Sequence, residues 1–361
     1  KKSTLRKEET MIYADFYYSR PQQIILVLIS VFSGSLSLCG SFTILSIIWR
    51  DRYEKLKYVY HRTLFAISII DCMTSIVFAW SFLAVPQGIF WGAIGTTSTC
   101  EASGFLTILL GAQFLYNFGL ALYFLMVIYY KTSQTCIATY LEPLIHMISL
   151  ATPIGLAIWA LSASALNPLL FIGGWCYVYP YPPGCSDIGN TPCTRGMASL
   201  QIRPVMNILM IAIPFVGIVI SLVMIMCRVR SIVAASMPNN LRSHLDRTAR
   251  QTAIQSLLYI TAMLIPQSLI ILTSSITNYD SMDRFILGIF AKLLIPIQGL
   301  SNLVIFIRPR YVALRERNGN AHSWYTLVRF IICGPESQDS HDSENNFAPE
   351  LTEVCVDSEM E

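Results

Sequence analysis

Long runs of apolar residues, separated by short polar or Gly/Pro-rich connections, recur seven times along the chain. Each run is about 20 residues or longer, the length of helix that crosses about 30 Å of hydrocarbon. The alternating pattern typical of a membrane β-barrel is absent. Because only helices and closed barrels satisfy their backbone hydrogen bonds in lipid, we expect seven membrane-spanning helices. The expected spans are roughly Ile24–Trp49, Thr63–Val85, Cys100–Tyr130, Pro143–Leu166, Val205–Cys227, Ala253–Ile276 and Phe285–Ile307.

Composition agrees with this pattern. Of the 361 residues, 54% are hydrophobic and only 13% are charged, and the mean hydropathy is +0.53. A soluble domain of this size needs far more charge to cover its surface. The predicted fold class is therefore an all-α membrane protein, a seven-transmembrane helix bundle in the lipid bilayer.

The placement of Lys and Arg predicts the orientation of the bundle. With the N-terminus outside, the inner loops and tail carry sixteen positive residues, whereas the outer loops carry three. The first 21 residues add five on the outer side and argue weakly for the reverse. The loop asymmetry favours an outside N-terminus and an inside C-terminus. The net charge of +3 is what remains of this asymmetry, so we expect no nucleic-acid partner.

The orientation divides the chain into four expected segments. Residues 1–21 form an extracellular N-terminal segment, which begins without a methionine and is expected to be truncated. Residues 22–308 form the seven-helix transmembrane domain, and residues 309–333 an amphipathic juxtamembrane segment. Residues 334–361 are acidic and polar, which is typical of a disordered cytoplasmic tail.

Four of the ten cysteines fall on the expected outer side: Cys100, Cys176, Cys185 and Cys193. An even number of cysteines in an oxidising compartment indicates two disulfides. Of three possible connectivities we favour Cys100–Cys176 with Cys185–Cys193, and four free thiols are the alternative. Cys333 ends an apolar, aromatic segment beyond the bundle. Palmitoylation there would attach this segment to the inner leaflet, and an unmodified thiol is the alternative.

Ionisable residues inside a membrane span are costly and are functional candidates by default. Asp71 on the second helix and Lys292 on the seventh are expected to lie about 6 Å apart along the membrane normal. They could form an ion pair if their helices are neighbours. Alternatively, Lys292 extends to the membrane surface and Asp71 bonds to water or to Asn302. Both alternatives are open at this point.

A further polar face recurs on the third helix at steps of three and four residues, and we expect it to point into the bundle. It consists of Gln113, Tyr116, Asn117, Leu120 and Phe124. Polar residues at such positions serve more often as contacts between helices than as ligand contacts.

The seventh apolar run contains four residues that are unusual in lipid, namely Lys292, Pro296, Gly299 and Asn302. They follow one another at intervals of four, three and three, so they should share one inward face of the helix. A proline at mid-span frees a carbonyl, and a glycine lets a neighbouring helix approach closely. We interpret the segment as a hinge with two packings, ended at the inner membrane surface by Arg308-Pro309-Arg310. The candidate residues of this switch are Asp71, Asn117, Lys292, Pro296, Gln298, Gly299 and Asn302.

Motifs of catalysis are not found in the sequence. The HExxH, GxSxG and P-loop patterns are absent, and the five histidines are scattered without the spacing of metal ligands. We therefore expect neither an enzyme nor a cofactor or metal.

The residues together resemble a G-protein-coupled receptor. The resemblance rests on the seven spans, on the outer cysteine of the third helix and on the outer-loop run GGWCYVYPYPPGC. The seventh-helix run PIQGLSNLVIFIRPRY is similar to the P-x-Q-G-x-x-N…RPR ending of the slime-mould cyclic-AMP-receptor-like group and related protist receptors, which sit near the secretin-like family. YHRTLFAISIIDCMTS fits the same group. The resemblance covers roughly Gln22–Arg317, although the third helix lacks the Asp-Arg-Tyr motif of rhodopsin-type receptors.

This resemblance implies a multi-pass plasma-membrane receptor without a cofactor. An unknown extracellular ligand would bind between the helices, at the candidates Gln113, Tyr116, Trp175 and Lys292. A heterotrimeric G protein would bind basic residues at the inner face of the bundle. The alternative role of these basic residues is ordinary interaction with anionic lipid headgroups. The G-protein contact candidates are Arg228, Arg230, Arg242, Arg247, Arg250, Arg308 and Arg310.

Two other functions compete with the receptor. A retinal photoreceptor would use Lys292 for a Schiff base, but the third helix offers only Glu101, at its outer rim, as a counter-ion. A small-solute transporter or channel would need a polar path, and neither such a path nor an inverted repeat is evident in the sequence.

Overall fold

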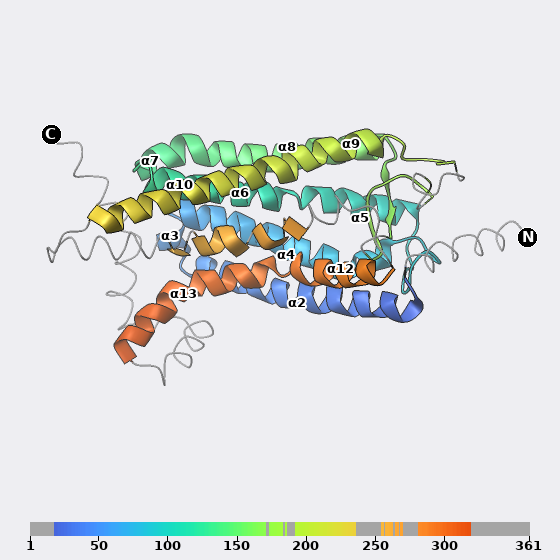
Figure 1. Cartoon of the computed structure of the whole chain (residues 1–361), viewed down its shortest axis with the longest axis horizontal. Helices are drawn as coiled ribbons and strands as arrows, with labels where there is room; N and C mark the ends of the chain where they lie inside the picture. Colours follow the sequence, from blue (N-terminus) through green and yellow to red (C-terminus); the bar gives the residue numbers. More distant parts are fainter. Residues whose placement is uncertain are drawn as a thin grey trace, which may run out of the picture.

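A bundle of long helices, with a two-stranded hairpin at one end, makes up the computed structural model (Figure 1). The structure describes residues 18–170, 173–182, 185, 192–235, 254–255, 257–262, 264–266, 268–269 and 281–318. We call the end with the hairpin the disulfide end. The opposite end, which carries the short helix α3 (Arg52–Lys55), is called the basic end.

Within the described residues, five helical stretches are long and apolar enough to cross a membrane, and the bent pair α12–α13 gives a sixth. The expected helical fold is therefore confirmed, and the length and apolarity of these helices suit a multi-pass membrane protein. The expected sixth span, Ala253–Ile276, is described only in part, so the count of seven stays a prediction. The stretches are α2 (Arg20–Arg50), α4 (Val59–Ala84), α5 (Thr97–Leu109) with α6 (Ala112–Ile128), α7 (Gln134–Cys136) with η1 (Ile137–Leu141) and α8 (Glu142–Ser162), α9 (Ser199–Met206) with η2 (Asn207–Ala212) and α10 (Ile213–Ala235), and α12 (Ser281–Leu294) with α13 (Gln298–Asn318).

Small polar residues face the interior of the bundle, whereas large apolar residues cover its surface. On α2 the buried face includes Ser30, Ser33, Ser37 and Ser41, and the exposed face includes Leu28, Phe32 and Phe42. In water this arrangement would be unfavourable, because large apolar side chains would be hydrated. It is the arrangement expected in lipid, where small residues let helices pack closely and apolar side chains face hydrocarbon.

Two π-helical turns, η1 and η2, each end two residues before a proline, Pro143 and Pro214. A proline has no N–H to donate to the carbonyl four residues earlier. The N–H of the following residue can reach that carbonyl in the i→i+5 pattern of a π-helix. The prolines therefore account for the widened turns in both membrane-crossing stretches.

The seventh apolar run is broken where the sequence predicts a hinge, but it continues where the sequence predicts an end. The helical segments Phe285–Leu294 and Gln298–Val312 meet at 44°, with Pro296 in the break. The expected end at Arg308-Pro309-Arg310 is wrong, because α13 runs through Pro309 to Asn318. One proline removes a single backbone donor, and the neighbouring helical hydrogen bonds can sustain the helix. The expected juxtamembrane segment 309–333 therefore begins as a continuation of α13.

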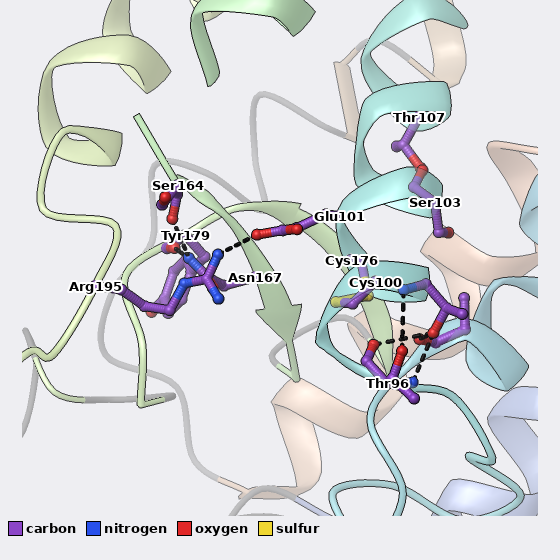
Figure 2. Close-up of a disulfide and its surroundings, with 12 residues drawn as sticks. Thr96, Cys100, Glu101, Ser103, Thr107, Ser164, Asn167, Cys176, Tyr179 and Arg195 are labelled. Carbon is purple, nitrogen blue, oxygen red and sulfur yellow. Dashed lines mark hydrogen bonds and ion pairs between the residues drawn. A yellow bond between two sulfur atoms is a disulfide. The ribbon is translucent and has the colours of Figure 1, made fainter. Parts of the chain in front are cut away.

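The hairpin at the disulfide end consists of β1 (Leu166–Leu169) and β2 (Trp175–Val178), which pair antiparallel. The fourth span therefore ends before Leu166, since α8 stops at Ser162. A disulfide joins Cys100 in α5 to Cys176 in β2 (Figure 2), and a second one joins Cys185 to Cys193. Both expected pairings are confirmed.

Polar contacts fix the N-terminus of α5 both to the hairpin region and to α4. The Arg195 guanidinium forms an ion pair with the Glu101 carboxylate (Figure 2). Thr96 caps α5 by accepting from the Thr99 N–H, and the Thr99 hydroxyl donates to the carbonyl of Ala84 at the end of α4. The start of α5 is thus attached to both the hairpin and α4.

We expect the two disulfides to contribute unequally to stability. Cys100–Cys176 spans 76 residues and Cys185–Cys193 spans 8, and a longer closed loop restricts the unfolded chain more, by about 2 kcal/mol here in the chain-entropy model. The Cys100→Ser/Cys176→Ser variant should therefore unfold at a clearly lower temperature than Cys185→Ser/Cys193→Ser. Thermal unfolding in detergent measures this, and equal midpoints for the two variants would contradict it.

Candidate functional site

Lys292 lies inside the bundle beneath the hairpin of the disulfide end. Its side chain is only 2% exposed, and its Nζ lies 4.4 Å from the centroid of the Trp175 ring. The Ser33 hydroxyl of α2 donates to the Lys292 carbonyl at 2.7 Å. One sequence-based alternative has Lys292 extending to the membrane surface. The structure instead holds this side chain inside the bundle, under the hairpin.

Trp175 forms the wall of this site. Its ring packs edge-on against Phe78 of α4 with 4.7 Å between the centroids, and its neighbour Cys176 is fixed to α5 by the disulfide. The indole is 7% exposed, and its Nε1 has no hydrogen-bond partner among the residues that the structure describes. Trp175 belongs to an apolar cluster with Ala291 and Ile295, against which Leu169 and Leu269 also pack.

The turn of the hairpin closes the site from the disulfide end. Gly173 and Gly174 both have positive φ, +87° and +66°, which favours glycine. A Cβ on Gly173 would lie 3.2 Å from Lys292 Cε, and one on Gly174 would lie 2.5 Å from the Phe90 ring. Only residues without a side chain fit here. We call the group of Lys292, Trp175, Gly173, Gly174 and Phe78 the Lys292 site.

Asp71 and Asn302 form a buried contact deeper in the bundle. The Asn302 Nδ2 donates to Asp71 Oδ2 at 2.8 Å, and each residue is 1% exposed. The Gln298 Nε2 in turn donates to Asn302 Oδ1 at 3.1 Å. Asp71 thus takes the alternative of bonding to Asn302. No ion pair with Lys292 is present among the described side chains, because Lys292 lies against Trp175 instead.

The backbones of α2 and α13 touch at two glycines. The Gly299 N–H donates to Ser37 Oγ at 2.9 Å. A Cβ on Gly299 would lie 2.6 Å from the Ser37 carbonyl oxygen, and a Cβ on Gly40 would lie 2.8 Å from backbone atoms of Gly299 and Leu300. The close approach predicted at Gly299 is therefore present, just below the break at Pro296.

The third-helix face points inward as predicted, since Gln113, Tyr116, Asn117, Leu120 and Phe124 are all buried. The Tyr116 hydroxyl and His146 Nδ1 share a 3.0 Å hydrogen bond, and the Asn117 Nδ2 donates to the Gln113 carbonyl at 2.7 Å. Of the four pocket candidates the structure therefore brings Trp175 and Lys292 together, whereas Gln113 and Tyr116 contact other partners.

A small cavity is lined by Asn117, Leu120, Ala121, Phe124, Ile218, Tyr259 and Ile260.

Two polar contacts near the basic end are not evident in the sequence. The Tyr60 and Tyr259 hydroxyls are 3.0 Å apart, and Gln255 Nε2 donates to Tyr60 at 3.2 Å. The Arg62 Nε donates to Glu142 at 2.6 Å. Tyr60 and Arg62 both belong to the run YHR at the start of the second span. Their main partners are 199 and 80 residues away, so no local spacing predicts them.

The basic residues expected to contact a partner divide between described and undescribed parts of the chain. Arg228 and Arg230 lie towards the end of α10, and Arg308 and Arg310 lie on α13. Both helix ends are at the basic end of the bundle (Figure 1). The candidates Arg242, Arg247, Arg250 and Cys333 lie outside the described residues.

No protein-family model matches the chain, and no curated protein matches it significantly. The function is therefore argued from the geometry of the bundle.

Glycine substitutions test the contact between α2 and α13. Gly299→Ala and Gly40→Ala should each lower the unfolding midpoint, because the new methyl group meets backbone atoms at 2.6 to 2.8 Å. Gly155→Ala in α8 is the matched control, since a Cβ there has nothing within 4 Å. It should leave the protein unchanged or stabilise it by up to about 1 kcal/mol. Equal effects at all three positions would contradict the close contact.

A double-mutant cycle tests the Asp71–Asn302 contact. We expect Asp71→Ala and Asn302→Ala to be coupled by about 0.5 to 1.5 kcal/mol, the range measured for hydrogen bonds between membrane helices. Ser301→Ala provides the control, because the bond of its hydroxyl among the described residues is local, to the Ile297 carbonyl just before α13. Unfolding in mixed micelles gives the free energies. If the effects of Asp71→Ala and Asn302→Ala on the free energy of unfolding add within about 0.3 kcal/mol, the expected interaction between the two side chains is contradicted.

Proposed function

We propose that this chain is a seven-transmembrane receptor of the G-protein-coupled type. It binds an extracellular ligand at the disulfide end and activates a heterotrimeric G protein at the basic end. The observation that carries the proposal is the bent pair α12–α13. One continuous stretch of chain holds Lys292 under the hairpin, the break at Pro296, the Asn302 contact to Asp71, and then the arginines Arg308 and Arg310.

The orientation in this proposal has the disulfide end outside the cell. Disulfides persist in oxidising compartments, and cytoplasmic loops carry an excess of Lys and Arg. The two disulfides and the arginine-bearing ends of α10 and α13 lie at opposite ends of the bundle (Figure 1). The separation of these two features along the bundle supports an outside N-terminus and an inside C-terminus at the plasma membrane.

Signalling in this scheme is a shift between two packings of α13. A ligand that contacts Lys292 or Trp175 changes the position of α12 relative to the hairpin. The bend at Pro296 transmits this change to α13, whose backbone lies against α2 at Gly299. The equilibrium between the packings can shift only if the ligand binds one of them more tightly than the other. The Asp71–Asn302 contact stabilises the packing seen here.

The photoreceptor alternative lacks support at its counter-ion. A protonated Schiff base on Lys292 would need a carboxylate close by, and the carboxylate at the top of α5, Glu101, forms an ion pair with Arg195. The transporter alternative has no specific observation in its favour, because the residues that surround the cavity of α6 are mostly apolar. The receptor remains the proposal.

Guanine-nucleotide exchange tests the receptor proposal. The protein is reconstituted in phosphatidylcholine nanodiscs, which removes anionic headgroups as partners of the arginines, together with purified heterotrimeric G proteins of each class. We expect receptor-dependent GDP release that Arg308→Ala/Arg310→Ala reduces severalfold. Lys57→Ala is the control, because Lys57 is also basic and at the basic end but pairs locally with Glu54.

Two results would count against the receptor. The first is no exchange with any G protein across a broad ligand library. The second is exchange that Lys57→Ala reduces as strongly as the arginine pair does, since this would indicate a general effect of charge on the membrane surface.

A further inference from the structure

The Lys292 site contains a buried amine that forms no ion pair, and a buried indole N–H that has no acceptor, among the residues that the structure describes. The Lys292 amine is buried against the face of Trp175, and the Trp175 Nε1 is buried without a hydrogen-bond partner. Within the described part of the chain no carboxylate forms an ion pair with Lys292. Glu101, at the same end of the bundle, is already paired with Arg195.

Contact with an aromatic face does not replace an anion. A cation–π interaction with a desolvated indole offsets only part of the cost of an unpaired charge inside a membrane. A buried indole N–H without an acceptor adds a further cost. These costs persist in a folded protein when a site is organised for a group that binds there.

The walls of the site restrict what this group can be attached to. Phe78, Leu169, Ala291 and Ile295 are apolar neighbours of Trp175, so a ligand body that contacts them is apolar or aromatic. One ammonium and one N–H match the single charge and two oxygens of a carboxylate. A phosphate dianion would leave a second charge and further oxygens without donors.

We propose that the Lys292 site binds the carboxylate of a small amphipathic acid, with the Lys292 ammonium and the Trp175 N–H as its donors. The apolar body of the acid packs against Phe78 and Ile295, which belong to the apolar cluster around Trp175. This inference rests on the proposed function in one respect, since it names the chemical class of the receptor's ligand.

Calorimetric titration of the full chain in phosphatidylcholine nanodiscs tests the site. The probes are benzoate, 3-phenylpropionate and octanoate, each compared with its neutral alcohol (benzyl alcohol, 3-phenylpropan-1-ol and octanol), and empty nanodiscs correct for partitioning. We expect at least one acid to bind and its alcohol to bind at least tenfold more weakly. Failure of all three acids, or equal binding of acid and alcohol, would overturn the inference.

Two variants assign the binding to the named donors. Lys292→Met keeps the length and apolar character of the side chain and should abolish acid binding, whereas Lys57→Met, at the opposite end, should not affect it. Trp175→Phe keeps an aromatic ring without the N–H and should weaken binding about five- to tenfold, which corresponds to one hydrogen bond. It also provides the test if Lys292→Met does not fold. Unchanged binding in either variant would overturn the assignment.

A lipid headgroup is the other source of an anionic oxygen. Thermal unfolding is therefore measured without acid in nanodiscs with and without phosphatidylglycerol. A rise in the unfolding midpoint that depends on phosphatidylglycerol and is lost in Lys292→Met would assign the site to lipid and overturn binding of a soluble acid. No such rise is expected.

The outcomes separate this inference from the receptor proposal, because the titrations need no G protein. A chain that binds the acid through Lys292 but never promotes nucleotide exchange would overturn the receptor and leave the site standing. A chain that promotes exchange with a neutral agonist, equally in Lys292→Met, would overturn the site and leave the receptor standing.

Discussion

The backbone contact between α2 and α13 at Gly40 and Gly299 determines where the rest of the bent pair α12–α13 can lie. In a membrane, apolar side chains gain little by exchanging contacts with lipid for contacts with another helix, so helices associate through close packing and hydrogen bonds. Here the packing is close enough that the Gly299 N–H bonds to the Ser37 hydroxyl. One turn further along α13, Asn302 then reaches Asp71. On the other side of the Pro296 break, Lys292 comes to lie under the hairpin.

The hairpin provides the second fixed point. Its strand β2 is covalently joined to α5 through Cys176, and the Glu101–Arg195 ion pair holds the chain that follows to the same helix (Figure 2). Trp175 is therefore positioned by α5, whereas Lys292 is positioned by α12. A site whose two walls belong to separately held elements senses their relative position, which is the physical basis of coupling between a ligand and a helix movement.

Much of the architecture is predictable from composition and spacing, because a membrane imposes strong local rules. Length and apolarity predict the spans, the two compartments predict the sorting of cysteines, and the three- to four-residue period predicts the inward face with Asn117. Two expectations at helix ends are wrong for local reasons. Leu166 leaves the helix for a strand, and α13 continues through Pro309.

The partners of the buried polar residues are harder to predict than the residues themselves. Asp71 and Lys292 are conspicuous in the sequence, but which of them meets Asn302 depends on the rotation of three helices. The Trp175–Lys292 contact depends in addition on the path of a loop, and the Tyr60–Tyr259 contact joins residues 199 positions apart. Spacing along one helix carries no information about such distances between helices.

The unbroken course of α13 past Pro309 makes this helix a lever. Arg310 lies 12 residues beyond Gln298, which begins α13, so it is about 18 Å from the bend. A rotation of α13 by about 10° at Pro296 would displace Arg310 by about 3 Å, for a helix with this rise per residue. A rotation of α13 too small to alter the packing around Lys292 noticeably would thus displace the charged group of Arg310 at the far end of the bundle.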